Sequence, residues 1–144
     1  MIREEDRPPE PPRPAVVPIL ICDQAIREVG TNKVTLVGIF ERISSSVFPF
    51  DWVRGGTVYA RLTDAQGMYS MRIELVRLED DQAVGREDFQ VTLENRMRVQ
   101  EIITEFGQLR FEHPGTYEFR LFANDRYLGG AILDVVDLEA QEGR

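Results

Sequence analysis

Residues 115–136 have the sequence GTYEFRLFANDRYLGGAILDVV, in which side-chain character alternates at almost every step. Tyr117, Phe119, Leu121 and Ala123 fall on one face, with polar residues and Phe122 on the other. This period of two is typical of a β-strand with one buried face. Asn124-Asp125 predicts a tight turn, so the stretch forms a hairpin with Phe122 opposite Tyr127. The alternation slips at Gly129-Gly130, which predicts a β-bulge there.

The same alternation recurs in three earlier segments, at residues 58–63, 71–75 and 89–93. Shorter alternating runs and turn sequences separate and flank them, such as Gly30-Thr31-Asn32-Lys33 and His113-Pro114-Gly115. Eight or nine strands with turns every 8–12 residues, and no long helical stripe, predict an all-β, antiparallel β-sandwich of immunoglobulin-like or jelly-roll-like type. An open barrel around a ligand cavity is the alternative.

Two segments are harder to assign from their pattern. Val34–Ile43 has apolar residues on both faces, which predicts one continuous strand in the centre of a sheet. Arg98–Phe106 alternates less regularly, and a short helix or a bulged strand fits it equally well.

The two ends of the chain differ in composition from the rest. Residues 1–14 hold five of the eight prolines and almost no apolar side chains, so we expect a disordered or extended leader. Within it Pro8, Pro11 and Arg13 match the Pro-x-x-Pro-x-Arg spacing of peptides that dock into aromatic grooves, which makes a recruitment peptide the alternative to a plain leader. Residues 139–144 form a polar tail, which leaves 15–138 as a single β-domain.

Charge and composition exclude several classes of function. The net charge is −8, with 25 acidic against 17 basic residues, and the arginines are dispersed among acids. Nucleic-acid and anionic-membrane binding are therefore not expected, since both depend on clustered positive charge. The start of the chain lacks the apolar stretch of a signal peptide, so the expected location is the cytoplasm. The single cysteine, Cys22, lies in an apolar run and is expected to be a buried thiol.

No combination of residues predicts catalysis, and the chain is not expected to be an enzyme. The only histidine, His113, lies in a Pro-Gly turn, and one His with one Cys cannot supply a structural zinc site. Acidic residues are numerous but lack the alternating spacing of calcium loops, and Ser44-Ser45-Ser46 lacks the glycines of a nucleophile elbow. We therefore expect no cofactor and no metal.

Aromatic residues are the strongest candidates for a binding surface. Phe48, Phe50 and Trp52 alternate, so an extended chain directs all three to one side. They either cap the end of the core or form an exposed platform for a sugar ring or a protein. Phe122 and Tyr127 pose the same alternative on an outer face: the leader or Trp52 covers them, or they form an interface.

The segments Ile19–Asp23 and Gly30–Phe40, together with Gly115-x-Tyr117-x-Phe119, resemble a family of small bacterial proteins known only as a domain of unknown function. Its members share an early Cys-Asp strand, a glycine-bearing turn and a strand that ends in Gly-Ile/Val-Phe. The likeness covers most of residues 15–136. It implies a β-sandwich and a bacterial origin, and it provides no catalytic or binding residues. Separately, Pro114–Tyr117 is similar to the segment of immunoglobulin-like domains in which a tyrosine braces a corner.

Three hypotheses about function follow from the sequence. The first is a non-catalytic interaction or structural module that binds a protein, with self-association as one form. The second is a binder of a carbohydrate or lipid that uses exposed aromatic rings. The third, and the weakest, is an enzyme whose carboxylates only the fold would bring together.

Overall fold

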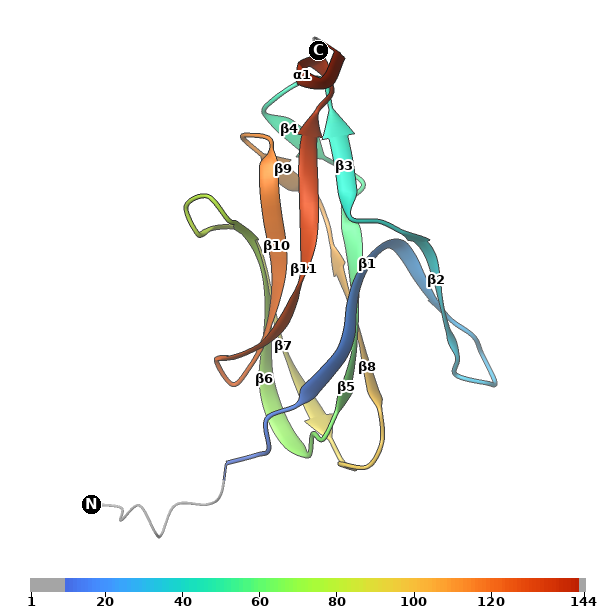
Figure 1. The fold of residues 1–144 in the computed structure, drawn as a ribbon. Helices are drawn as coiled ribbons and strands as arrows, with labels where there is room; N and C mark the ends of the chain where they lie inside the picture. The colour runs from blue at the N-terminus through green and yellow to red at the C-terminus, as the bar shows by residue number, and fades with distance from the viewer. Residues whose placement is uncertain (1–9, 143–144) are drawn as a thin grey trace, which may run out of the picture.

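The computed structural model describes residues 10–142 of the chain (Figure 1). Over this range the protein is all-β, with eleven strands and one short helix. The strands are β1 Ala15–Arg27, β2 Val34–Ile39, β3 Arg42–Ser45, β4 Phe50–Trp52, β5 Gly56–Thr63, β6 Gly67–Arg77, β7 Gln82–Leu93, β8 Gln100–Phe106, β9 Leu109–Phe111, β10 Gly115–Ala123 and β11 Arg126–Asp137. The helix α1, Leu138–Glu142, ends the described chain, and no described helix has the length and apolarity needed to span a bilayer.

The strands form three sheets. A four-stranded sheet has the order β2-β1-β5-β8, a five-stranded sheet has the order β3-β11-β10-β6-β7, and β4 pairs with β9. Every strand pairing is antiparallel except that of β3 with β11, which is parallel. The described residues thus contain more strands than the eight or nine expected, because two three-residue strands are present and one predicted strand is divided.

The divided strand is Val34–Ile43, and its prediction as a central strand was wrong. Residues 34–39 form β2 at the edge of the four-stranded sheet, whereas residues 42–45 form β3 in the other large sheet. The break follows Gly38, whose φ of +67° favours glycine. Two short strands in different sheets bury different faces, and this produces an apolar pattern that looks two-sided.

The other strand predictions agree with the structure. Asn124 and Asp125, with φ of +49° and +64°, form the tight turn between β10 and β11, because a two-residue turn of this kind needs positive φ at both positions. Phe122 pairs with Tyr127, and the register shifts beside that pair, so that Leu128 is the extra residue and lies directly before the two glycines. Arg98–Phe106 contains β8, which resolves the choice in favour of a strand.

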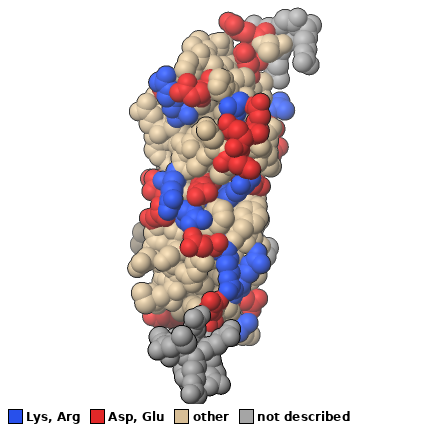
Figure 2. Space-filling model, turned by 90° about the vertical axis from the view of Figure 1, so that its left-hand side faces the viewer, with Lys and Arg blue, Asp and Glu red and all other residues tan. Residues whose placement is uncertain are grey.

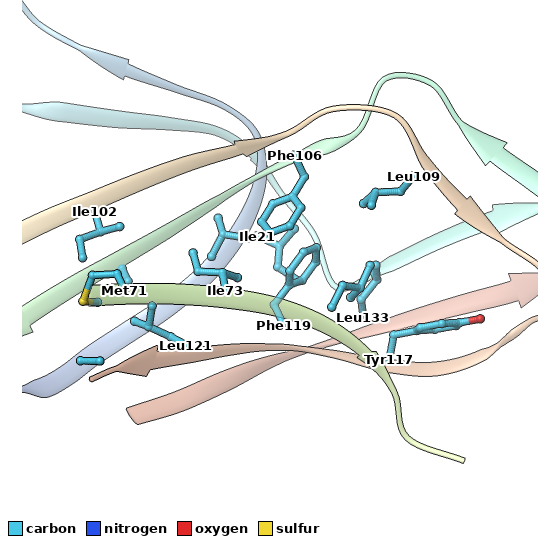
Figure 3. Packing of buried hydrophobic residues seen from close by; sticks show 14 of the residues in the cluster. Ile21, Met71, Ile73, Ile102, Phe106, Leu109, Tyr117, Phe119, Leu121 and Leu133 are labelled. Carbon is cyan, nitrogen blue, oxygen red and sulfur yellow. The ribbon is translucent and has the colours of Figure 1, made fainter. Parts of the chain in front are cut away.

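One hydrophobic core collects side chains from both large sheets (Figure 3). Ile21 and Ile102 come from the four-stranded sheet, and Ile73, Phe119 and Leu133 come from the five-stranded sheet. All five are at most 5% exposed. Burial of this many apolar groups is the main stabilising contribution to the fold, at about 25 cal/mol per Å² of apolar surface removed from water.

Tyr117 connects the core to a surface turn. Its ring is buried against Phe111, with ring centroids 4.9 Å apart, and its hydroxyl donates a hydrogen bond of 2.7 Å to the carbonyl of His113. A buried tyrosine that bonds back to the backbone four residues earlier fixes the path of the chain into β10.

Candidate functional site: an aromatic surface on the five-stranded sheet

Strand pairing gathers five side chains on the outer face of the five-stranded sheet. Phe122 in β10 lies opposite Arg72 in β6 on one side and opposite Tyr127 in β11 on the other. Glu118 and Arg120 precede Phe122 at alternate positions of β10, so they share its face. We call Arg72, Glu118, Arg120, Phe122 and Tyr127 the aromatic surface.

The aromatic rings of this surface are only partly covered. Phe122 and Tyr127 have ring centroids 5.8 Å apart at an interplanar angle of 63°, an edge-to-face contact that aromatic pairs favour. The guanidinium carbon of Arg72 lies 4.3 Å from the centroid of Phe122, within the range of a cation–π interaction. Tyr127 remains 42% exposed. A shallow hollow of about 340 Å³ lies between Glu118, Arg120, Phe122 and Tyr127.

Each arginine of the surface lies between two acids. Arg120 bonds to Glu118 at 2.7 Å and to Asp81 at 3.2 Å, and these acids raise its pKa. Arg72 bonds to Asp125 at 2.6 Å and lies 2.9 Å from Glu74, although that second contact lacks hydrogen-bond geometry and is an ion pair only. Acids and bases also alternate over the face of the molecule seen in Figure 2.

The ionisation of Tyr127 follows from its surroundings. Partial burial raises the pKa of its hydroxyl, and the negative charge of Glu118 raises it further. Tyr127 is therefore a neutral phenol near neutral pH.

Residues 10–14, the described part of the predicted leader, lie beside this surface. Arg13 donates a hydrogen bond to the carbonyl of Tyr127, and Glu10 pairs with Arg126. Tyr69 donates a 2.6 Å bond to the carbonyl of Pro12. Three residues made up the predicted recruitment peptide. Pro11 is half-buried, Arg13 is held by its hydrogen bond to the Tyr127 carbonyl, and Pro8 lies outside the described residues. A groove that recognised Arg13 would have to replace its bond to Tyr127.

The other predicted aromatic group has a different position. Trp52 is only 8% exposed and lies in the core, 6.0 Å from Phe111 between ring centroids. Phe48 and Phe50 are half-buried and pack edge to face, 6.4 Å apart. The structure thus places Phe48, Phe50 and Trp52 as a cap on the end of the core, the first of the two alternatives. Trp52 does not cover Phe122, because it is buried there.

The polar residues considered for chemistry are separate from one another. His113 is exposed in its turn, and Cys22 is fully buried, where burial raises the pKa of its thiol. Among residues 10–142, no group of three or more His, Cys, Asp or Glu side chains has a geometry suited to a metal ion. Sequence reasoning missed Arg72, since only the pairing of β6 with β10 brings it beside the rings. Glu118 and Arg120 share the face of Phe122 on β10, but nothing in the sequence singled them out.

Comparison with known families gives one match. The family of unknown function DUF6941 matches residues 18–136, which is most of the chain. The chain belongs to DUF6941. This confirms the predicted resemblance to a family of unknown function over the strand region. No curated protein matches the chain, so no activity is transferred from a relative.

The region matched by DUF6941 includes the aromatic surface and the edge strand β2. It begins inside β1 and ends inside β11, so it contains every residue of the aromatic surface and all of β2. Residues 10–14 and helix α1 lie outside the matched region.

Proposed function

We propose that this DUF6941 protein is a β-sandwich of immunoglobulin-like or jelly-roll-like type that acts as a non-catalytic protein-interaction module. Two large sheets that share one core support the sandwich, and the bond from Tyr117 to the carbonyl of His113 favours the immunoglobulin-like form. The dispersed acidic and basic residues support a partner that is neither nucleic acid nor a membrane.

One observation supports protein binding most directly: the exposed Phe122–Tyr127 pair between ion-paired arginines. Tyrosine and arginine are enriched among the residues that contribute most to protein–protein affinity, because each buries a large area and also forms hydrogen bonds. Here the arginines are already oriented by acids, which lowers the entropy lost on binding.

The alternative is a binder of a small carbohydrate or lipid at the same surface. The hollow beside Phe122 and Tyr127 supports it, since a sugar ring can stack on one aromatic ring while Glu118 or Arg120 bonds to its hydroxyls. The hollow is shallow, whereas sites that bind small molecules tightly bury most of the ligand. We therefore favour a protein.

The test is affinity capture from the native cells with three forms of the full chain: wild type, Tyr127→Ala and Leu78→Ala. Leu78 is 39% exposed and so matches Tyr127 in exposure, but it lies in the turn after β6. We expect at least one partner to be lost with Y127A and retained with L78A, and its purified form to bind with the same preference. Equal capture by all three forms contradicts the proposal. Heats of binding to oligosaccharides that disappear in Y127A would instead establish the alternative.

A further inference from the structure

Strand β1 supports two different structures with its two halves. Residues 15–22 pair with β5 in the body of the domain, whereas residues 22–27 pair with β2. Within residues 10–142, β1 therefore has a neighbouring strand on one side only beyond Cys22, and β2 pairs with no described strand except β1. Residues 23–39 form a two-stranded arm that stands away from the body (Figure 1). The arm meets the body at the ion pairs of Arg27 with Glu101 at 3.3 Å and Asp23 with Arg54 at 3.8 Å. Its residues Lys33 and Val34 also border a hollow beside Tyr59.

An isolated two-stranded hairpin is at best marginally stable in water, whereas three or more strands stabilise one another. The arm also exposes apolar side chains that a free hairpin would not be expected to retain. Val29 at its tip is 98% exposed, and Ile39 on β2 is 56% exposed. A further strand along β2 would stabilise the hairpin and cover its exposed apolar side chains.

The edge of β2 is open to such a strand. The amide of Glu28 donates to the carbonyl of Lys33 at 2.8 Å, so the backbone groups of Lys33 face β1. Because these groups alternate along an antiparallel strand, those of Val34 and Leu36 face outward. They are free to pair with a second strand.

The four edge strands of the two large sheets differ in how they are protected against pairing. Edge strands usually contain charged residues or are very short, which prevents association. β8 contains Glu101 and Glu105, β7 contains Arg86, Glu87 and Asp88, and β3 has only four residues, including Arg42. β2, Val-Thr-Leu-Val-Gly-Ile, has no charged residue. Within the described chain it is the one long edge of these sheets without this protection.

The features at the two ends of the arm complement each other. The tip has the exposed Val29 and the positive charge of Lys33. At the base lies Glu41, beside a hollow of about 410 Å³ whose lining includes Leu20, Phe40 and Ile132. An antiparallel pair of arms brings each tip to the other base. The outward-facing groups of Val34 and Leu36 fit a pair centred on Thr35, which sets Val34 of each copy opposite Leu36 of the other.

We propose that two copies of this chain dimerise by antiparallel pairing of their β2 strands, which joins the two arms into one four-stranded sheet. The interface is isologous, with each tip seated at the hollow of the other copy. It uses no residue of the aromatic surface, and it does not depend on the function proposed above.

The test is sedimentation equilibrium of the full chain over a range of concentrations, with Val37→Lys and Gln90→Lys as matched variants. Val37 and Gln90 are both exposed, and each substitution adds a lysine to an edge strand, on β2 and β7 respectively. We expect a concentration-dependent dimer for the wild type and Q90K, and at least a tenfold higher dissociation constant for V37K. Equal unfolding midpoints for the wild type, V37K and Q90K show that the differences do not arise from folding. A wild-type chain that is monomeric at its highest soluble concentration overturns the proposal, and so does a dimer that V37K leaves unchanged.

Discussion

The hydrogen bond between Tyr59 and Glu101 makes the stability of the domain depend on pH in a defined direction. Tyr59 lies on the outer face of β5, only 7% exposed, and its hydroxyl donates to the carboxylate of Glu101. Arg27 holds the same carboxylate at 3.3 Å. Burial first, and then the hydrogen bond and charge of Glu101, raise the pKa of Tyr59 to about 12.

The sign of the effect follows from the proton bound in each state. The unfolded chain loses the Tyr59 proton near pH 10, the ordinary value for tyrosine, whereas the folded protein keeps it up to about pH 12. The raised pKa therefore contributes its full stability below pH 10, and this contribution is lost as the pH rises through the folded value. A difference of about two pH units corresponds to roughly 3 kcal/mol, at about 1.4 kcal/mol per unit.

The assay compares urea unfolding of the wild type and Tyr59→Phe between about pH 9 and pH 12. Other groups that titrate in this window are present in both proteins, so their contributions cancel in the difference. We expect the stability advantage of the wild type to shrink by roughly 2 kcal/mol by pH 12, where about half of the folded molecules still hold the Tyr59 proton. Glu101→Gln, which keeps an acceptor and removes the charge, should make the loss smaller. Parallel stability curves for the wild type and Y59F would refute the reasoning.

Two further predictions concern the packing of the core and the backbone. Phe111→Ala removes a fully buried ring that contacts Tyr117, and it should lower the free energy of unfolding by about 3–5 kcal/mol. In the same denaturation experiment, Phe122→Ala on the outer face should lower the free energy of unfolding by well under half of that amount. Gly55→Ala should cost more than about 2 kcal/mol, because Gly55 has φ of +65° and an added Cβ would lie 2.0 Å from the Phe106 carbonyl oxygen. Gly107→Ala meets nothing within 4 Å and should change the thermal midpoint little; equal effects of the two glycine substitutions would contradict this account.

Local turn chemistry explains which parts of the fold the sequence predicted. The β10–β11 hairpin was predictable because Asn124 and Asp125 specify a two-residue turn. This turn fixes the register that sets Phe122 opposite Tyr127. The two aromatic residues of the aromatic surface were therefore available from the sequence. Arg72 was not, because its place beside Phe122 depends on the register between β6 and β10, which no short-range signal specifies.

Assignment of strands to sheets was predicted less well, for a related reason. An alternating pattern shows which side chains share a face, but not which sheet the strand joins. Val34–Ile43 alternates through a break at which the chain leaves one sheet for the other, and a glycine with positive φ is the only local sign of it. Phe48, Phe50 and Trp52 all pack against the core, and their burial depends on β9, which pairs with β4 from a distant part of the sequence.

The two proposed surfaces share no residue, although Ile132 in the hollow at the base of the arm pairs with Glu118 of the aromatic surface. The arm continues the four-stranded sheet through β2, whereas the aromatic surface lies on the outer face of the five-stranded sheet (Figure 1). A dimer joined by its arms pairs through residues other than Phe122 and Tyr127, so it presents the two copies of these rings as a pair. Two linked sites bind a partner that has repeated or paired targets more strongly than either site alone, because the second contact becomes intramolecular. Dimerisation through β2 would thus strengthen binding at Tyr127, and V37K would weaken capture of such a partner while leaving each site intact.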